Sequence, residues 1–195
     1  MSACFADKSS VVRRQALLIM TRLISEDFVK MRSLIFFRFV HSLVDDDENV
    51  KNFARSCLLD VLNAKDPKLL SSNFIDTLFY FTGNLNDTIL NEDPQFHKIF
   101  RLSNKTKRRE AYLTIINHMN NPSLFQLLKQ LCDKVLNSFI EGQIDLEDGE
   151  IILSDTFDYI LKTENAMEFI NADLNLLEEQ TDKIAEQGRI FFNTS

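Results

Sequence analysis

The sequence predicts an all-α fold, and more narrowly an α-solenoid of paired helices. Only 4 Gly and 3 Pro interrupt a chain of 195 residues that is 45% hydrophobic and contains 17 Phe, which favours long helices around a sizeable core. The chain also repeats itself, because "DKSSVVRRQALLIMTRLI" and "DDDENVKNFARSCLLDVL" align at an offset of 38 residues. A period of about 40 residues that carries helical patterns is typical of stacked helix pairs.

Three kinds of residue set the register of this repeat. An Asp at the turn lies near the start of the following helix, where the helix dipole and unbonded N–H groups favour an anion. A small Ala lets two helices approach closely, and a basic residue is predicted to pair with an Asp of its own or a neighbouring repeat. The equivalent residues in the two units are Asp7 and Asp45, Arg13 and Lys51, and Ala16 and Ala54.

The first helix pair is predicted at residues 9–25 and 27–44. The first segment has an apolar stripe at helical spacing, with Ser9 or Ser10 as the N-cap. The second is so rich in Phe that we expect it to be buried on more than one face.

A second pair follows the acid run 45–48. Apolar residues recur at intervals of three and four from Val50 onwards, and Asp66-Pro67 ends that helix or starts the next. Residues 68–82 are its predicted partner, and Gly83 is the expected C-terminal stop.

A long insertion is predicted at about residues 83–103, with one short helix near 96–102, because periodicity is poor there. Helical patterns return further on, and glycines 142 and 149 are expected to bracket a turn. We therefore predict a repeat array of about three to four helix pairs over residues 1–163, followed by an acidic terminal helix and tail over 164–195. The later helices are predicted at residues 104–119, 121–141, 150–163 and 165–187.

The acid run itself resembles the start of a calcium-binding loop. Asp45, Asp47 and Asn49 occupy the first three ligand positions of such a loop. The sixth position requires Gly but holds Val50, and the twelfth requires Glu but holds Ser56. We therefore predict no metal site, and interpret the run as the turn between two helices of one repeat.

Basic residues cluster in "HKIFRLSNKTKRREAY", although the chain has a net charge of −7. Residues 1–140 hold 19 basic and 15 acidic residues, whereas residues 141–195 hold 3 and 14. Such a cluster can bind a phosphate backbone by releasing counterions, or it can be an ordinary solvated face, and both interpretations stay open. Lys107 and Arg108 could also form the ion pairs of the repeat. The candidates for nucleic-acid contact are Lys98, Arg101, Lys105, Lys107, Arg108 and Arg109.

We find no constellation that predicts catalysis or a cofactor. The three His residues lack a catalytic or metal-binding context, and four scattered Gly cannot build a phosphate loop. Cys4, Cys57 and Cys132 are isolated and are interpreted as reduced core thiols of an intracellular protein. No stretch is apolar over the roughly 18 residues that a membrane-spanning helix needs.

Several segments resemble the HEAT-repeat D subunits of condensin II. They are "SSVVRRQALLIMTRLI", "LIFFRFVHSLVDDDENVKNFARSCL", "SNFIDTLFYFTGN", "NKTKRREAYLTIINHM" and "LSDTFDYIL", and together they cover roughly residues 7–163. This chain is far shorter than that family's members, and the helix at 9–25 has the pattern of a second helix without room for a first. We therefore expect a fragment, a truncated gene model or a short divergent form.

The resemblance implies a non-enzymatic scaffold subunit of the nucleus and chromosome. In that family, HEAT subunits associate with a kleisin that bridges two SMC ATPases, and they help the complex engage DNA during mitotic chromosome condensation. The expected partners are therefore kleisin and SMC subunits, with the DNA phosphate backbone as a further candidate. The alternative is an adaptor that binds an extended peptide, such as a kleisin segment or a histone tail, without nucleic-acid contact.

Overall fold

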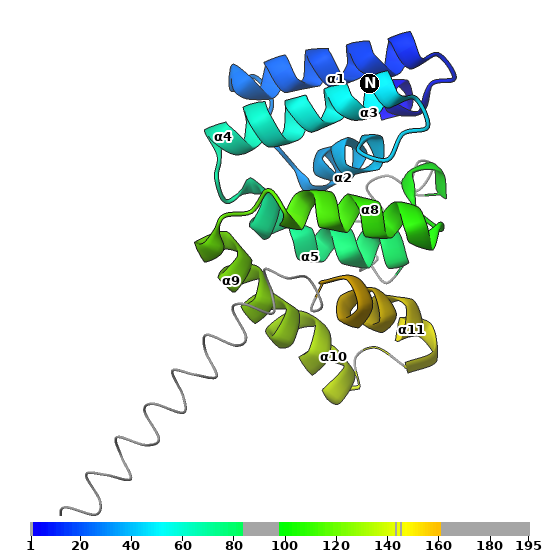
Figure 1. Ribbon diagram of the computed structural model, residues 1–195, viewed down its shortest axis with the longest axis vertical. Helices are drawn as coiled ribbons and strands as arrows, with labels where there is room; N and C mark the ends of the chain where they lie inside the picture. The colour runs from blue at the N-terminus through cyan, green and yellow to red at the C-terminus, as the bar shows by residue number, and fades with distance from the viewer. Residues whose placement is uncertain (1, 84–97, 143, 145, 161–195) are drawn as a thin grey trace, which may run out of the picture.

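The computed structural model describes residues 2–83, 98–142, 144 and 146–160 (Figure 1). All regular elements within these residues are helices, which confirms the predicted all-α class. The insertion at 83–103 is described at Gly83 and from residue 98 onward, where residues 98–100 are helical as predicted. The predicted acidic helix and tail at 164–195 lie outside the described residues.

The chain opens with a short 3₁₀ turn, η1, and the first long helix, α1. Ser9 is the N-cap of α1, at one of the two positions that the sequence predicts. Its counterpart one repeat later is Asp47, which caps helix α3 and also lies 38 residues further on. The bounds are η1 Ser2–Ala6, α1 Ser10–Ser25 and α3 Glu48–Arg55.

Helix α2 (Ser33–Ser42) is shorter than the predicted span 27–44. The reason is the end of α1, where Asp27 takes a left-handed conformation with φ 61°. The N–H of Phe28 then bonds the carbonyl of Leu23 at 2.9 Å, which terminates the helix and redirects the chain. Asp can adopt this conformation without the Gly that usually marks it, so the residue types at this position do not predict the helix end.

Among the described residues, three helices contain a segment whose hydrogen bonds span five residues rather than four, and one of them is α11 (Leu146–Asp155), which continues into η4 (Thr156–Ile160). Helix α3 continues without a break through η2 and α4, and helix α9 continues through η3 and α10. Buried Leu and Val side chains lie in η2 and η3, and η2 packs on α1. The bounds are η2 Ser56–Leu62, α4 Asn63–Lys65, α9 Asn121–Gln130, η3 Leu131–Leu136 and α10 Asn137–Ile140.

The remaining helices agree with the predicted order, with one correction. Gly83 ends α5 with φ 90°, as expected of a C-terminal glycine. Gly149, predicted to bound a turn, lies inside helix α11, and a Cβ added there would collide with the ring of Phe139. This glycine therefore permits close helix packing. The bounds are α5 Leu69–Thr82, α8 Lys105–Ile116, α11 Leu146–Asp155 and η4 Thr156–Ile160.

The helices stack in two layers, as a solenoid requires (Figure 1). In one layer, α1 packs on α3 and η2, and α8 packs on η4. In the other, α2 packs on α5, which packs on α9. One continuous core runs between the layers from Phe5 to Ile152, and Ala16, Ala54 and Ala111 are all buried in it. The repeat period in the sequence thus corresponds to one step along this stack.

Candidate partner-binding surface

The turn at residues 45–48 binds the repeat before it. Asp45 accepts two hydrogen bonds of 2.8 Å from the guanidinium of Arg13, and both side chains are largely buried. Arg13 also donates to the backbone carbonyls of Asp7 (2.8 Å) and Lys8 (3.2 Å). The hydrogen bonds that Arg13 donates to Asp45 raise the pKa of Arg13 above its ordinary value. A bidentate pair of this kind fixes both the distance and the angle between two repeats.

The neighbouring acids of this turn bind the following repeat and the local helix. Asp46 accepts a 2.6 Å hydrogen bond from Lys107 of α8, which lowers the pKa of Asp46. Asp47 caps α3 through the N–H groups of Asn49 (2.9 Å) and Val50 (3.3 Å). With Glu48 bonded to Lys51 at 2.8 Å, the run joins three successive repeats through protein contacts.

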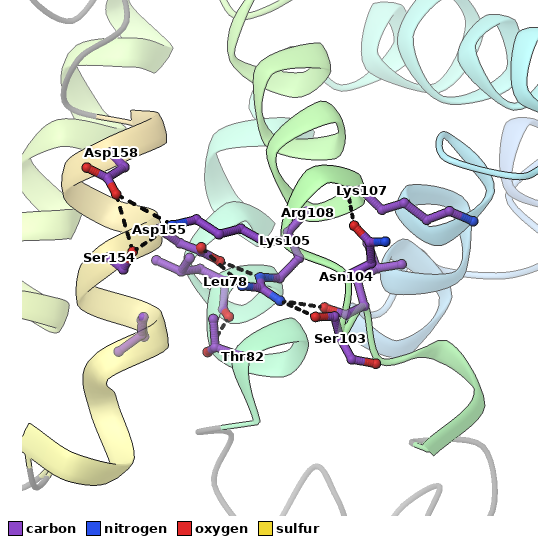
Figure 2. A network of polar contacts seen from close by, with 12 residues as sticks. Leu78, Thr82, Ser103, Asn104, Lys105, Lys107, Arg108, Ser154, Asp155 and Asp158 are labelled. Carbon is purple, nitrogen blue, oxygen red and sulfur yellow. Dashed lines mark hydrogen bonds and ion pairs between the residues drawn. The ribbon is translucent and has the colours of Figure 1, made fainter.

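The basic segment at the start of α8 contains a second buried pair (Figure 2). Arg108 donates to Asp155 through Nε at 2.5 Å and Nη2 at 3.3 Å. It also donates to the carbonyls of Leu102 and Ser103, each at 3.0 Å. These carbonyls lie six and five residues before Arg108, as Asp7 and Lys8 lie before Arg13, so the same device occurs in both repeats.

This geometry corrects the predicted role of Arg108. Its side chain is only 5% exposed and that of Asp155 is fully buried, so Arg108 presents no surface to a phosphate. Arg108 instead takes the other role that the sequence allowed, the ion pair of the repeat. Burial, with the Asp155 carboxylate as a second cause, also raises the pKa of the neighbouring Tyr112 well above its ordinary value.

Two other members of the basic segment are exposed but paired. The Lys105 ammonium lies 3.3 Å from Ser154 Oγ and 3.7 Å from the Asp158 carboxylate (Figure 2). Lys105 and Lys107 remain 56% and 37% exposed, and their partners Asp158 and Asp46 are 43% and 91% exposed. Exposed pairs of this kind are worth only about 0–1 kcal/mol, so both ammonium groups can exchange partners.

The last three members point to different places. Lys98 is exposed on the short helix at 98–100. Arg101 is exposed and donates at 3.1 Å to the carbonyl of Thr82, the last residue of α5. Arg109 is exposed on the outer face of α8. The six predicted residues therefore do not form one surface.

Arg109 lines a groove that the sequence did not reveal. The groove has a volume of about 520 Å³ and follows the outer face of α8 for its whole length. Arg55 reaches it from α3, and His118 closes it beyond the end of α8. The other lining residues are Thr106, Glu110, Leu113, Thr114 and Asn117.

Sequence reasoning also missed the partners that act across long sequence distances. Asp155 lies within residues 141–195, where the sequence holds 14 acidic and 3 basic residues, yet it is buried. Lys65 donates to the carbonyls of Ile24 (3.0 Å) and Ser25 (2.9 Å), and so caps the C-terminus of α1 from the next repeat. The "LSDTFDYIL" segment was the one signal for Asp155, because the family resemblance included it.

No feature of the described residues indicates metal chemistry. Among the residues that the structure describes, no group of three or more His, Cys, Asp or Glu side chains could hold a metal ion. No helix in the described part of the chain is long and apolar enough to cross a membrane. Cys57 is buried, but Cys132 is exposed, so the prediction of three core thiols is wrong for Cys132.

Stacked helix pairs, joined by Arg–Asp pairs and offering an outer groove, define a helical-repeat scaffold of the HEAT type. Comparison with known families identifies it further: the chain belongs to the family described as Cnd1, non-SMC mitotic condensation complex subunit 1, which matches residues 1–154. This confirms the resemblance seen in the sequence.

Individual relatives agree with this assignment. The chain is 33% identical over 171 residues to condensin-2 complex subunit D3-L of Xenopus laevis, which covers 84% of this chain and 11% of the relative. It is 30% identical over 194 residues to condensin-2 complex subunit D3 of Mus musculus, covering 94% and 13%. For subunit CAP-D3 of Arabidopsis thaliana the identity is 28% over 164 residues, covering 77% and 12%. The chain thus spans a small part of each relative's length, and no solved structure matches it.

Proposed function

We propose that this chain is a non-catalytic scaffold segment of a condensin-type complex that supports mitotic chromosome condensation in the nucleus. The observation that carries the proposal is the family match over residues 1–154, which includes the Arg13–Asp45 pair and reaches to within one residue of Asp155, the partner of Arg108. In this role the array holds kleisin and SMC partners in fixed positions, and any ATP hydrolysis belongs to the SMC chains.

The inter-repeat bonds support a scaffold role. Each buried Arg–Asp pair restricts how one helix pair can rotate on the next, because two parallel hydrogen bonds tolerate little change of angle. Solenoids whose neighbouring repeats are fixed in this way present a surface of constant curvature to a partner.

Direct DNA contact is the finer part of the proposal. The residues proposed to contact phosphates are those of the basic segment that remain exposed: Lys98, Arg101, Lys105, Lys107 and Arg109. Lys105 and Lys107 each pair with an exposed carboxylate, and a phosphate can replace such a partner at small cost.

Duplex binding measured against salt concentration tests this contact. We expect the affinity of the wild-type chain to fall as salt rises, and the slope to shrink by roughly two in Lys105→Glu/Lys107→Glu. Lys30→Glu is the matched control, since Lys30 is an exposed cation in the loop between α1 and α2. The absence of salt-dependent binding, or an unchanged slope in the double variant, contradicts the DNA contact.

A second candidate function is an adaptor that binds an extended peptide through the groove along α8. The groove favours this function because its lining combines Arg55 and Arg109 with the apolar Leu113, a mixture that suits a peptide. Its two Arg residues favour an acidic peptide over a basic histone tail.

Membership of the complex is tested separately, by affinity purification of the tagged chain from mitotic extract. We expect SMC and kleisin chains to co-purify, and a Cys132→Ser variant to serve as a matched surface control. Recovery of neither chain contradicts the scaffold proposal and the adaptor proposal in its kleisin form.

A further inference from the structure

The groove along α8 has the composition of a docking site for an acidic segment. Its lining residues on α8 recur at intervals of three and four, so they form one continuous outward face. From Thr106 to Asn117 this face is roughly 17 Å long at the rise of an α-helix, which matches about five residues of extended chain.

The charges in the groove are unbalanced. The lining contains the guanidinium groups of Arg55 and Arg109 and a single carboxylate, that of Glu110. This carboxylate already accepts from Lys51 at 3.2 Å and from Arg55 at 3.5 Å. Lys51 and Arg55 thus share one acid, and Arg55 leaves the groove positive.

The guanidinium of Arg55 makes few hydrogen bonds to the described residues. Its one hydrogen bond to a described residue is the 3.5 Å contact with Glu110, at the limit of hydrogen-bonding distance. Its buried Nε has no partner among the described residues. A guanidinium has five N–H donors in a planar fork that matches a carboxylate, so Arg55 has donors to spare for a second one.

The floor of the groove distinguishes a peptide from a phosphate backbone. Leu113 lies between the charged residues and offers an apolar contact. Glu110, in the middle of the groove, would repel a continuous row of phosphates, whereas a peptide can place an apolar side chain between two acids. The outward face of α8 also lies away from Lys105 and Arg108, which Figure 2 shows pointing toward α11.

We propose that the groove between α3 and α8 binds an extended acidic peptide of a partner protein, with carboxylates on Arg55 and Arg109 and an apolar side chain over Leu113. The inference rests on the proposed scaffold role and deepens its adaptor form, since it specifies the chemistry of the partner and where it binds.

The test uses the full chain and fluorescence anisotropy with a labelled Glu-Glu-Leu-Glu-Glu peptide at about 150 mM salt. We expect saturable binding of this peptide and none of its Gln-Gln-Leu-Gln-Gln analogue. Arg55→Gln is expected to weaken binding by about tenfold, because a charge-assisted hydrogen bond is lost. Asn117→Glu, at an exposed position of the same groove, is expected to weaken binding as well. Lys30→Glu, outside the groove, leaves the affinity unchanged.

Three results overturn the proposal. The first is no binding by the wild-type chain, or equal binding of the neutral analogue. The second is an equal loss in Lys30→Glu, which indicates unspecific charge attraction. The third is binding that appears only after Glu178→Gln/Glu179→Gln, which indicates that an acidic segment of this same chain fills the groove.

Parallel measurements separate this inference from the proposed function. Complex membership is read from co-purified chains and does not depend on the peptide, so its failure is recognised independently. Competition of duplex DNA with the peptide, abolished by Arg55→Gln, would assign the groove to nucleic acid and overturn the peptide proposal.

Discussion

Arg108 and Asp155 form a buried, bidentate ion pair between residues that are 47 positions apart in the sequence. Arg13 and Asp45 form an equivalent pair across an earlier junction, and both Arg residues also bond the carbonyls five and six residues before them. These two junctions between helix pairs thus use the same arrangement of Arg, Asp and backbone carbonyls, although the repeats differ in most of their sequence.

Removing one partner of the buried pair should be costly. Arg108→Met leaves the Asp155 carboxylate buried without its partner, and we expect a loss of about 3–5 kcal/mol in the free energy of unfolding. Denaturant unfolding followed by circular dichroism measures it. The exposed neighbour serves as the control, because Arg109→Met should change stability by no more than about 0.5 kcal/mol. Equal losses in the two variants contradict the assignment.

The start of α8 depends on a side-chain cap. Asn104 Oδ1 accepts from the N–H groups of Thr106 (2.9 Å) and Lys107 (3.2 Å). Asn104→Ala should therefore lower the free energy of unfolding by about 1 kcal/mol, whereas Asn104→Asp keeps an acceptor and should be nearly neutral. Thermal unfolding of both variants checks this, and a stable Ala variant would show that the cap is dispensable.

Stability should fall on mild acidification because of His41. Burial lowers the pKa of His41 from 6.5 to about 4, while Asp45 and Asp46 oppose this shift and Lys107 and Arg13 add to it. Between these values the unfolded chain binds a proton that the folded chain does not, so stability is lost as pH falls from 6.5 towards 4.

The His41 effect can be isolated by mutation. Between about pH 7 and pH 5, the free energy of unfolding of His41→Gln should fall by up to roughly 2 kcal/mol less than that of the wild type. The reason is that the variant has no imidazole to protonate. The free energy of unfolding in urea at both pH values measures the difference. Identical pH dependence in the two proteins rules out a neutral buried His41.

Gly149 should not tolerate a larger side chain. A Cβ at this position meets the ring of Phe139, so Gly149→Ala should destabilise the fold by about 1–3 kcal/mol through overpacking, despite the higher helix propensity of Ala. Phe139→Leu in the same chain should recover part of the loss. Thermal unfolding of the single and double variants decides it, and a more stable Gly149→Ala would exclude the contact.

Local signals account for the parts of the fold that the sequence predicts well. Gly83 marked the end of α5 because a left-handed conformation depends on the residue itself. Ser9 occupies the N-cap position of α1, although its side chain makes no capping hydrogen bond. The start of α2 was predicted six residues too early, because Asp27 takes the left-handed conformation without a glycine. Gly149 was misplaced for the opposite reason, since its need for a small residue comes from a distant ring.

The candidate site was less predictable than the fold. Clustered charge in the sequence defined the candidate segment, but the pattern could not separate the buried Arg108 from the exposed Arg109 beside it. The choice depends on Asp155, which only tertiary packing brings close. The groove was likewise invisible, because Arg55 and Arg109 belong to different repeats.

The acid run at residues 45–48 has a mechanical consequence. Asp45 is bonded to the repeat before it and Asp46 to the repeat after it, through adjacent residues of one short turn. Bending at the Arg13–Asp45 junction therefore also moves Asp46, so a force applied at one junction between repeats acts on the next one as well. The Arg13–Asp45 pair is largely buried, whereas the Lys107–Asp46 pair is exposed and weak. Under tension the array should therefore separate first between α3 and α8.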